Sequence, residues 1–410
     1  MNSAVNPGDT AWVLASAALV MLMTLGLGLF YGGMVRRKNV LATILQSFIM
    51  VGIVSVQWVL FGYSLAFGPD KWHIIGGLNW VGLRGVGMAP NPDYAPTIPH
   101  EAFMIFQAMF AVITPALITG AFAERMRFKS FFIFAILWAT LVYDPVCHWV
   151  WAPGGWLRNL GALDFAGGTV VHICSGIAAL ACAITLGRRK GHGKEDMMPH
   201  NLTMTLIGAG LLWFGWFGFN AGSALAANGL AASAFVVTNT AAAAAALSWV
   251  LVETWHRGKP TALGAASGAV AGLVAITPAS GFVGPVAAIA IGGIVSLICY
   301  AAIMMKGKLG YDDSLDVFGI HGVGGAWGAL ATGLFATVLI NPAGANGLFH
   351  GNPKLVLVQL AAIVSVGAYS FVGTGLLLKV TSVFSDLRVS HEEEDTGLDL
   401  TQHGEVGYSL

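Results

Sequence analysis

The sequence predicts an all-α membrane protein that crosses the bilayer many times, and composition is the first reason. Of the 410 residues, 56% are hydrophobic and only 10% are charged, with a mean hydropathy of +0.74, whereas soluble chains carry about 25% charged residues. The 54 glycines are the second reason, because helices in lipid approach one another at small residues. The net charge of zero argues against nucleic acid or any strongly charged partner.

Apolar runs between charged breaks predict eleven transmembrane helices, since about 20 apolar residues cross the bilayer. They define a transmembrane domain over residues 1–383, followed by a polar tail over 384–410 that is acidic from Glu392 to Asp395 and could contact a soluble partner. The predicted spans are 10–31, 40–66, 101–123, 130–150, 166–187, 201–225, 231–256, 262–279, 283–305, 317–339 and 355–383.

The first helix sets the orientation. It follows only Asp9 and precedes Arg36, Arg37 and Lys38, which is typical of a retained helix with its N-terminus outside. With alternate loops assigned inside from that start, sixteen of the 20 Lys and Arg residues fall on one side. This bias predicts that side to be cytoplasmic, and an odd helix count then places the C-terminus in the cytoplasm.

Five helices over 10–187 and five over 201–339 predict an inverted repeat, because each half holds an odd number of helices. A weak internal echo agrees: His172 in the fifth helix and His321 in the tenth each precede a glycine by four residues. The eleventh helix, 355–383, lies outside the repeat.

His172 and His321 are the only two of the eleven histidines predicted inside helices rather than at helix ends, in loops or in the tail. An inverted two-fold axis would bring them together near the bilayer midplane. Buried histidines that only hydrogen-bond a neighbouring helix are one interpretation; a pathway is the other, because ionisable groups are costly in the membrane. Two touching imidazoles cannot both be charged, but they can share one proton.

Aromatic side chains suggest a constriction and a cation site. Trp216, Phe219 and Ser223 follow one another along the sixth helix, Phe110 lies in the third, and Trp151 lies where the fourth leaves the membrane. A cation between Trp151, Phe110 and the Ser223 hydroxyl would gain cation–π and hydrogen-bond stabilisation. Taken singly, each aromatic is typical of packing or of an interfacial belt.

Two acidic residues near helix ends have less specific roles. Asp164 precedes the fifth helix, where an N-terminal carboxylate caps a helix and could still fix the geometry of a nearby site. Asp144 precedes Pro145, and we expect it to be a helix-end or vestibule charge. The four cysteines form no CxxC pair, so disulfides, metals and cofactors have no support.

Together these segments resemble the ammonium transporter family, the Amt/Mep/Rh superfamily, and in particular its bacterial Amt branch. The similarity extends over essentially the whole chain. The motifs that carry it are Phe30-Tyr-Gly-Gly33, Gly120-Ala-Phe-Ala-Glu-Arg125, Asp164-Phe-Ala-Gly-Gly-Thr-Val-Val-His172, Gly218-Phe-Asn-Ala-Gly-Ser223, Asp316-Val-Phe-Gly-Ile-His321-Gly and Gly397-Leu-Asp399-Leu-Thr401-Gln-His-Gly404-Glu405.

The resemblance implies a homotrimer with one pore per subunit in the cytoplasmic membrane. It also implies a role for each motif residue. Phe110, Trp151 and Ser223 would recruit ammonium with support from Asp164, Phe110 and Phe219 would form the gate, and His172, His321 and Trp216 would line the pore. Members of the Rh branch generally lack the Trp and Ser, so their presence favours the Amt branch.

The tail resembles the segment through which PII-type signalling proteins plug the cytoplasmic exits of relatives, and its motif residues are Gly397, Asp399, Thr401 and Gly404. Thr401 stands where eukaryotic relatives carry a regulatory phosphorylation threonine. Two positions depart from the family pattern. Leu25 replaces a common proline of the first helix, which puts the kink there in doubt, and Asp144 replaces an apolar residue.

The expected mechanism follows from chemistry, because ammonium and potassium are similar in size. Carrying a charge through hydrocarbon costs at least a few kcal/mol, and potassium cannot lose its charge, whereas ammonium can leave a proton at the Phe gate and cross as ammonia. We expect the histidines and transient water to carry the proton separately, so that transport is electrogenic. No enzyme activity is expected.

Three alternatives remain open. An intramembrane redox or metal enzyme would need further ligands, and the helices contain no His-x-x-His or Glu-x-x-His pair. A sensor would signal through the tail, which is short. A passive ammonia channel of Rh type would not need the vestibule residues.

Overall fold

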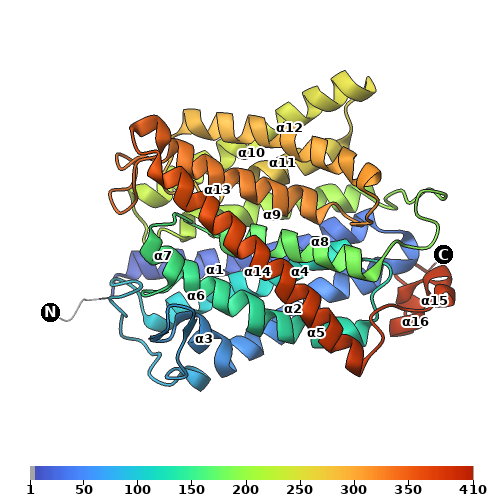
Figure 1. Ribbon diagram of the computed structural model, residues 1–410, viewed down its shortest axis with the longest axis horizontal. Coiled ribbons are helices and arrows are strands. Elements are labelled where there is room, and N and C mark those ends of the chain that lie inside the picture. The colour runs from blue at the N-terminus through green and yellow to red at the C-terminus, as the bar shows by residue number, and fades with distance from the viewer. Residues whose placement is uncertain (1–4, 410) are drawn as a thin grey trace.

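The computed structural model describes residues 5–409 as a bundle of long helices that run between two ends (Figure 1). The helix α1 begins at one end of the bundle, and the short tail helices lie at the other end. The chain is therefore an all-helical protein with many apolar spans. The apolar side chains exposed around the bundle, such as Phe214, Leu251 and Val286, are those that lipid would cover.

Nine helical segments among the described residues are long and apolar enough to cross a membrane. Six of them are single helices and three combine shorter ones. They are α1 (Pro7–Met34); η1 (Arg37–Asn39) with α2 (Val40–Gln57), η2 (Trp58–Gly62) and α3 (Tyr63–Phe67); α4 (His100–Phe122); α5 (Phe128–Trp138) with η4 (Ala139–Tyr143), α6 (Asp144–Trp151) and α7 (Trp156–Leu160); η5 (Gly168–Ile173) with α8 (Cys174–Leu186); α9 (Leu202–Gly222); α10 (Gly229–Arg257); α12 (Pro285–Leu309); and α14 (Lys354–Phe384).

The two remaining predicted spans coincide with shorter helices, α11 (Ala262–Ile276) and η6 (Phe318–Gly322) with α13 (Val323–Phe335). Both end before the predicted residue. The α11 helix ends close to Pro278, because proline has no backbone N–H with which to continue the helical hydrogen bonds. Beyond α13, the backbone N–H of Thr337 bonds the carbonyl of Phe282 instead of continuing the helix. The α1 helix shows no break at Leu25.

Small elements occupy the two ends. Strands β1 (Asp70–Lys71) and β2 (Ile75–Gly76) form an antiparallel hairpin, and the short turns η3 (Val81–Leu83) and η7 (Leu348–His350) lie in loops. The tail folds into α15 (His391–Thr396) and α16 (Leu398–His403). The tail lies against the loops at its end of the bundle (Figure 1).

Glycines allow the central helices to approach closely. A side chain at Gly208 of α9 would collide with the backbone of Phe30 in α1, and one at Gly26 would press on Leu211. The fifth and tenth spans cross in the same way, since a side chain at Gly176 would collide with the backbone of Gly322. These crossings bring the elements that carry the predicted site residues to the middle of the bundle.

Candidate functional site

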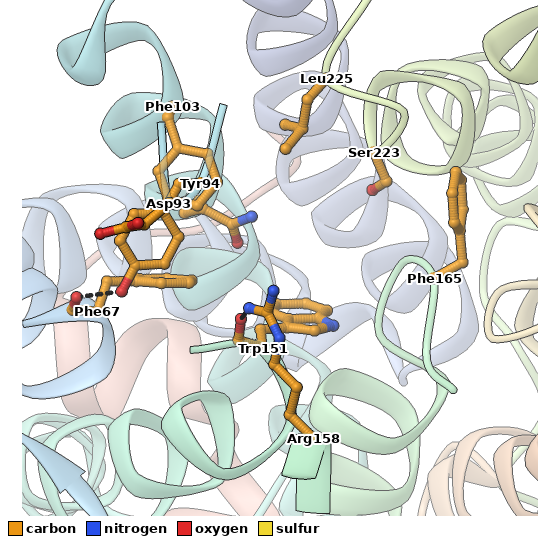
Figure 2. A pocket seen from close by; sticks show the side chains of 10 residues that line it. Phe67, Asp93, Tyr94, Phe103, Trp151, Arg158, Phe165, Ser223 and Leu225 are labelled. Carbon is orange, nitrogen blue, oxygen red and sulfur yellow. Dashed lines mark hydrogen bonds between the residues drawn. The ribbon is translucent and has the colours of Figure 1, made fainter. Parts of the chain in front are cut away.

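An open vestibule of about 180 Å³ lies at the end of the bundle opposite the tail. Figure 2 shows Trp151 and Ser223 on its walls, together with Arg158, Tyr94 and Leu225. Both aromatic and polar side chains line it, which suits a small cation. The lining residues are Phe67, Asp93, Tyr94, Phe103, Gln107, Trp151, Arg158, Phe165, Ser223 and Leu225.

Hydrogen bonds fix the two predicted recruitment residues that line the vestibule. The indole N–H of Trp151 donates to the carbonyl of Asp164 over 2.9 Å. The hydroxyl of Ser223 donates to the carbonyl of Phe219 over 2.8 Å. Because that hydroxyl proton is used within its own helix, the oxygen lone pairs of Ser223 remain to accept a hydrogen bond from a guest.

The floor of the vestibule is closed by an aromatic stack. The ring of Phe110 meets Trp151 edge-on, with centroids 5.7 Å apart, and lies 4.3 Å from the ring of Phe219. Phe110 and Phe219 are both fully buried. The structure therefore places Phe110 beneath the vestibule rather than on its wall, as a barrier that water cannot cross without side-chain movement.

Asp164 acts on the backbone and does not line the vestibule. Its two carboxylate oxygens accept four backbone N–H bonds at 2.7–3.1 Å from Gly167, Gly168, Thr169 and Val170. These groups form the N-terminus of η5, where a carboxylate also complements the helix dipole. Gly167 has a φ of 114°, a left-handed conformation that favours glycine. Asp164 thus sets the start of the helix that carries His172.

His172 and His321 touch beneath the aromatic stack. Their Nδ1 atoms are 3.2 Å apart, and both rings are buried. Each lies in a π-helical turn, η5 or η6, a distortion that is frequent at functional sites. The ring of His172 stacks on Trp216 at 5.4 Å, and the indole N–H of Trp216 is held by Thr277 at 2.9 Å.

The short contact between the Nδ1 atoms determines which hydrogen-bonding groups the two Nε2 atoms offer to a guest. One Nδ1 must donate and the other must accept, so in the neutral pair one Nε2 is an acceptor and the other is a donor. The Nε2 of His172 is buried and has no hydrogen-bond partner among the described residues. The pair can therefore offer one donor and one acceptor to a small polar molecule.

A narrow apolar cavity runs along the two histidines. It holds about 10 Å³ of room for the centre of a water-sized molecule, which is about one such molecule. Apart from the two imidazoles and the indole of Trp216, its walls are apolar side chains. They are Met23, Leu27, Phe30, Ile113, Leu117, Val171, Leu212, Phe219 and Val270. A second cavity of about 50 Å³ continues from His321 toward Asp316.

Sequence reasoning missed four polar vestibule residues: Asp93, Tyr94, Gln107 and Arg158. Asp93, Tyr94 and Arg158 lie in or near irregular loops, where the spacing of residues in the sequence does not predict the direction of a side chain. Gln107 carried the only usable signal, because it lies one turn before Phe110 in an apolar helix. Its Oε1 is buried and has no partner among the described residues.

Asp144 was predicted as a helix-end or vestibule charge, and this interpretation is wrong. Its side chain is fully buried and lines neither the vestibule nor the histidine cavity. Its helix continues directly from the π-helical turn η4, so Asp144 is internal to the fourth span. Local sequence could not distinguish a helix end from the interior of the fourth span. Pro145 is accepted in the first turn of a helix, and it is accepted equally in the first turn of the segment α6, which continues from η4.

The tail residues lie together on the loop between α1 and α2. The Asp399 carboxylate accepts two backbone N–H groups from the first turn of α2 at 2.8 and 3.0 Å. Gly397 and Gly404 have left-handed φ values of 108° and 69°, and a side chain at Gly397 would collide with Lys38. The Thr401 hydroxyl donates to the Gly397 carbonyl at 2.9 Å.

No group of three or more His, Cys, Asp or Glu side chains within residues 5–409 could hold a metal ion. The two other deeply buried histidines have structural partners. His148 contacts the carbonyl of Ala66 and the carboxylate of Asp70, both at 2.9 Å, and His100 contacts the Tyr63 hydroxyl at 2.6 Å.

Known proteins resemble this chain over nearly its whole length. A sequence model of the Ammonium Transporter Family matches residues 11–408. An ammonium transporter of Bacillus subtilis is 58% identical over 402 residues, which cover 98% of each chain. The crystal structure of Saccharomyces cerevisiae Mep2 has a TM-score of 0.89 at 36% identity, covering 95% of this chain and 88% of Mep2. A solved "Sensor Amt Protein" has a TM-score of 0.89 at 30% identity, covering 97% and 98%.

Proposed function

The chain belongs to the ammonium transporter family, and on this premise we propose how it works. It recruits ammonium in the vestibule, removes a proton at the Phe110–Phe219 stack, and conducts ammonia past His172 and His321. The observation that carries this proposal is the imidazole pair, with its Nδ1 atoms 3.2 Å apart, in a cavity that has room for about one water-sized molecule.

Recruitment uses groups that favour a cation. Ammonium over the ring faces of Trp151 and Phe110 gains cation–π stabilisation, on the order of 0.5–2 kcal/mol, and an N–H can donate to the free lone pairs of Ser223. Gln107 also lines the vestibule, and its buried Oε1, which has no partner among the described residues, supplies a further acceptor. Asp164 supports this site by holding Trp151 through its carbonyl group.

Selectivity follows from the dry path below the stack. A charged guest would lose its water shell among hydrocarbon walls, which costs at least a few kcal/mol. Ammonium avoids that cost by releasing a proton and crossing as ammonia, which both donates and accepts hydrogen bonds. The donor and acceptor Nε2 atoms of the histidine pair match this chemistry, whereas potassium has no such route.

The released proton travels separately through the histidines and transient water, so transport is electrogenic. Each chain forms its own path, because residues of one chain line both the vestibule and the cavity. The assembly is a homotrimer with one such pore per subunit. Eleven spans in an inverted five-plus-five repeat, with an additional last helix, cross the cytoplasmic membrane with the N-terminus outside. The tail faces the cytoplasm, where a PII-type protein docks.

Currents on a solid-supported membrane test this mechanism. Purified protein in liposomes receives ammonium and potassium pulses, alongside a His172→Ala/His321→Ala variant. His350→Ala serves as the matched control, because this histidine is exposed. The wild type and the control should carry ammonium current only, and the double variant should lose potassium exclusion.

The other outcomes separate the alternatives. If the double variant keeps both its ammonium current and its potassium exclusion, the proposed role of the histidines is wrong. Internal alkalinisation on an ammonium pulse without current would indicate a passive ammonia channel. Ammonium binding without current or alkalinisation would indicate a sensor.

A further inference from the structure

Asp144 is a buried acid that the proposed transport path does not use. Its side chain is fully buried, and it forms none of the ion pairs found among residues 5–409. One carboxylate oxygen, Oδ2, accepts a hydrogen bond of 2.8 Å from Nε2 of Gln57. The other, Oδ1, has no partner among the described residues.

Gln57, the partner of Asp144, also has one oxygen without a hydrogen-bond partner. Its Nε2 donates to Asp144 and contacts the hydroxyl of Thr140 at 3.2 Å, but its Oε1 is buried without a partner. Thus two neighbouring groups, already joined by one hydrogen bond, each keep one unused acceptor. Leaving a buried acceptor unpaired destabilises the fold, and an unpaired carboxylate charge at this depth would destabilise it more.

One proton would give both unpaired oxygens a hydrogen bond. If Oδ1 of Asp144 carries a proton, this O–H can donate to Oε1 of Gln57 while Nε2 of Gln57 donates to Oδ2. The carboxylic acid and the amide then form a cyclic pair with two parallel hydrogen bonds and no net charge. We propose that Asp144 is an intramembrane proton-binding site whose proton completes a carboxylic acid–amide pair with Gln57.

The position of the pair gives the proton a structural consequence. Gln57 ends α2 and directly precedes the π-helical turn η2, while Asp144 directly follows the π-helical turn η4. The Gln57 amide packs over Gly62, where any side chain would collide with it. The proton therefore clamps the second span to the fourth at the two points where each departs from regular α-helix.

The fourth span continues from Asp144 to Trp151 within α6. One turn beyond Asp144, His148 ties the same helix to the carbonyl of Ala66 in α3. The acid–amide pair and this second tie together hold α6 against the second span. The pair thereby positions Trp151 in the vestibule, a consequence that rests on the proposed recruitment role of Trp151.

Infrared spectroscopy tests the proton directly, without any transport assay. The absorption of the purified wild type minus that of Asp144→Asn should contain the carbonyl band of a protonated carboxylic acid. We expect this band at neutral pH, where an ordinary Asp is ionised. If the difference spectrum instead contains carboxylate bands, Asp144 is ionised, with or without a bound cation, and the proposal is wrong.

A stability cycle tests the clamp. Asp144→Asn should keep the melting temperature near that of the wild type, because an Asn side chain can form the same cyclic pair with Gln57. Gln57→Leu and Asp144→Leu should each lower the melting temperature by several degrees, and the double Leu variant should recover much of this loss. Additive losses in the double variant would overturn the clamp.

Transport separates this inference from the proposed function. Gln57→Leu should raise the ammonium concentration needed for half-maximal current several-fold, while potassium stays excluded. If the infrared band is present but neither the wild type nor any variant carries current, the proton site stands and the transport mechanism fails. If currents are normal and the acid band is absent, the transport mechanism stands and the proton site at Asp144 is wrong.

Discussion

Asp164 shows how one residue can hold two parts of a site. Its carboxylate accepts four backbone N–H bonds at the start of η5, and its carbonyl accepts the indole N–H of Trp151. The aromatic wall of the vestibule and the turn that carries His172 are therefore joined through a single residue. Its role depends on the acceptor geometry of both oxygens rather than on attraction of a cation.

We therefore expect Asp164→Asn to reduce the ammonium current at least tenfold. The substitution turns one acceptor oxygen into an NH2 group that faces backbone N–H donors of η5, at a cost of about 1–3 kcal/mol. Currents and thermal unfolding of the purified protein measure both effects. Asp93→Asn is the matched control, since Asp93 lines the vestibule and is exposed. Equal losses in the two variants would indicate that charge, not geometry, matters.

The residues of the site differ in how far sequence could predict them. His172 and His321 were predicted to meet because they lie in matching helices, and the structure brings their Nδ1 atoms within 3.2 Å. Asp93 lies in a loop and Arg158 in the short helix α7, and both were missed because the path of the surrounding loops decides where they point. The partnership of Gln57 with Asp144 was missed as well, because helix spacing fixes neither the rotation nor the depth of a helix against its neighbour.

At the level of elements, hydrophobicity predicted the position of a helix in every predicted span. It did not predict the π-helical turns within those spans. Apolar runs mark where a helix lies in lipid, and each predicted range contains one. The π-helical turns η2, η4, η5 and η6 have no signature in hydropathy, because an inserted residue changes the helix rotation and leaves the composition unchanged. These four turns adjoin or contain Gln57, Asp144, His172 and His321.

The two histidine turns meet only because small residues adjoin them. A side chain at Gly176 would overlap the backbone of Gly322, and one at Gly325 would press on His172. The contact between the fifth and tenth spans is therefore a backbone-to-backbone approach.

Gly176→Ala should separate these spans and weaken the histidine contact. Overpacking of a tight contact costs about 1–3 kcal/mol, and a longer distance between the Nδ1 atoms would disrupt their hydrogen bond. We expect a lower melting temperature and loss of most of the ammonium current. Gly210→Ala is the matched control, because a side chain there would meet nothing within 4 Å. Wild-type current in Gly176→Ala would mean that the close crossing is unnecessary.

On the scale of the whole molecule, a buried ion network joins distant segments at the tail end. Glu124, after α4, accepts hydrogen bonds from Arg36 at 2.6 and 2.9 Å and lies 3.4 Å from Arg189. Arg189 also pairs with Asp312 at 2.9 Å. The tail joins this region through Arg388, which contacts Glu394 and the carbonyl of Leu186. The loops and the tail thus form one charged layer.

The acids of this layer are held in their charged forms. Burial alone would raise the pKa of Glu124, but Arg189 and Arg36 more than offset it and lower the pKa below its ordinary value. Burial likewise acts to raise the pKa of Asp312, and Arg189 lowers it well below the usual range. A depressed carboxyl pKa stabilises the folded state above the unfolded pKa, and this contribution is lost as the pH falls through the folded pKa.

This linkage predicts how stability depends on pH. The wild-type melting temperature should stay nearly constant from pH about 8 to about 5 and fall below about pH 4, where an unperturbed Glu takes up a proton. Glu124→Gln leaves Arg36 and Arg189 without their carboxylate, so it should cost roughly 3–5 kcal/mol at neutral pH. The difference between wild type and variant should then shrink as the pH falls, because acid neutralises Glu124 in the wild type as well.

Thermal unfolding in detergent at stepwise pH measures this difference, with Glu101→Gln, an exposed site at the other end of α4, as the control. A difference that stays constant across the whole pH range would show that the charge of Glu124 does not stabilise this layer.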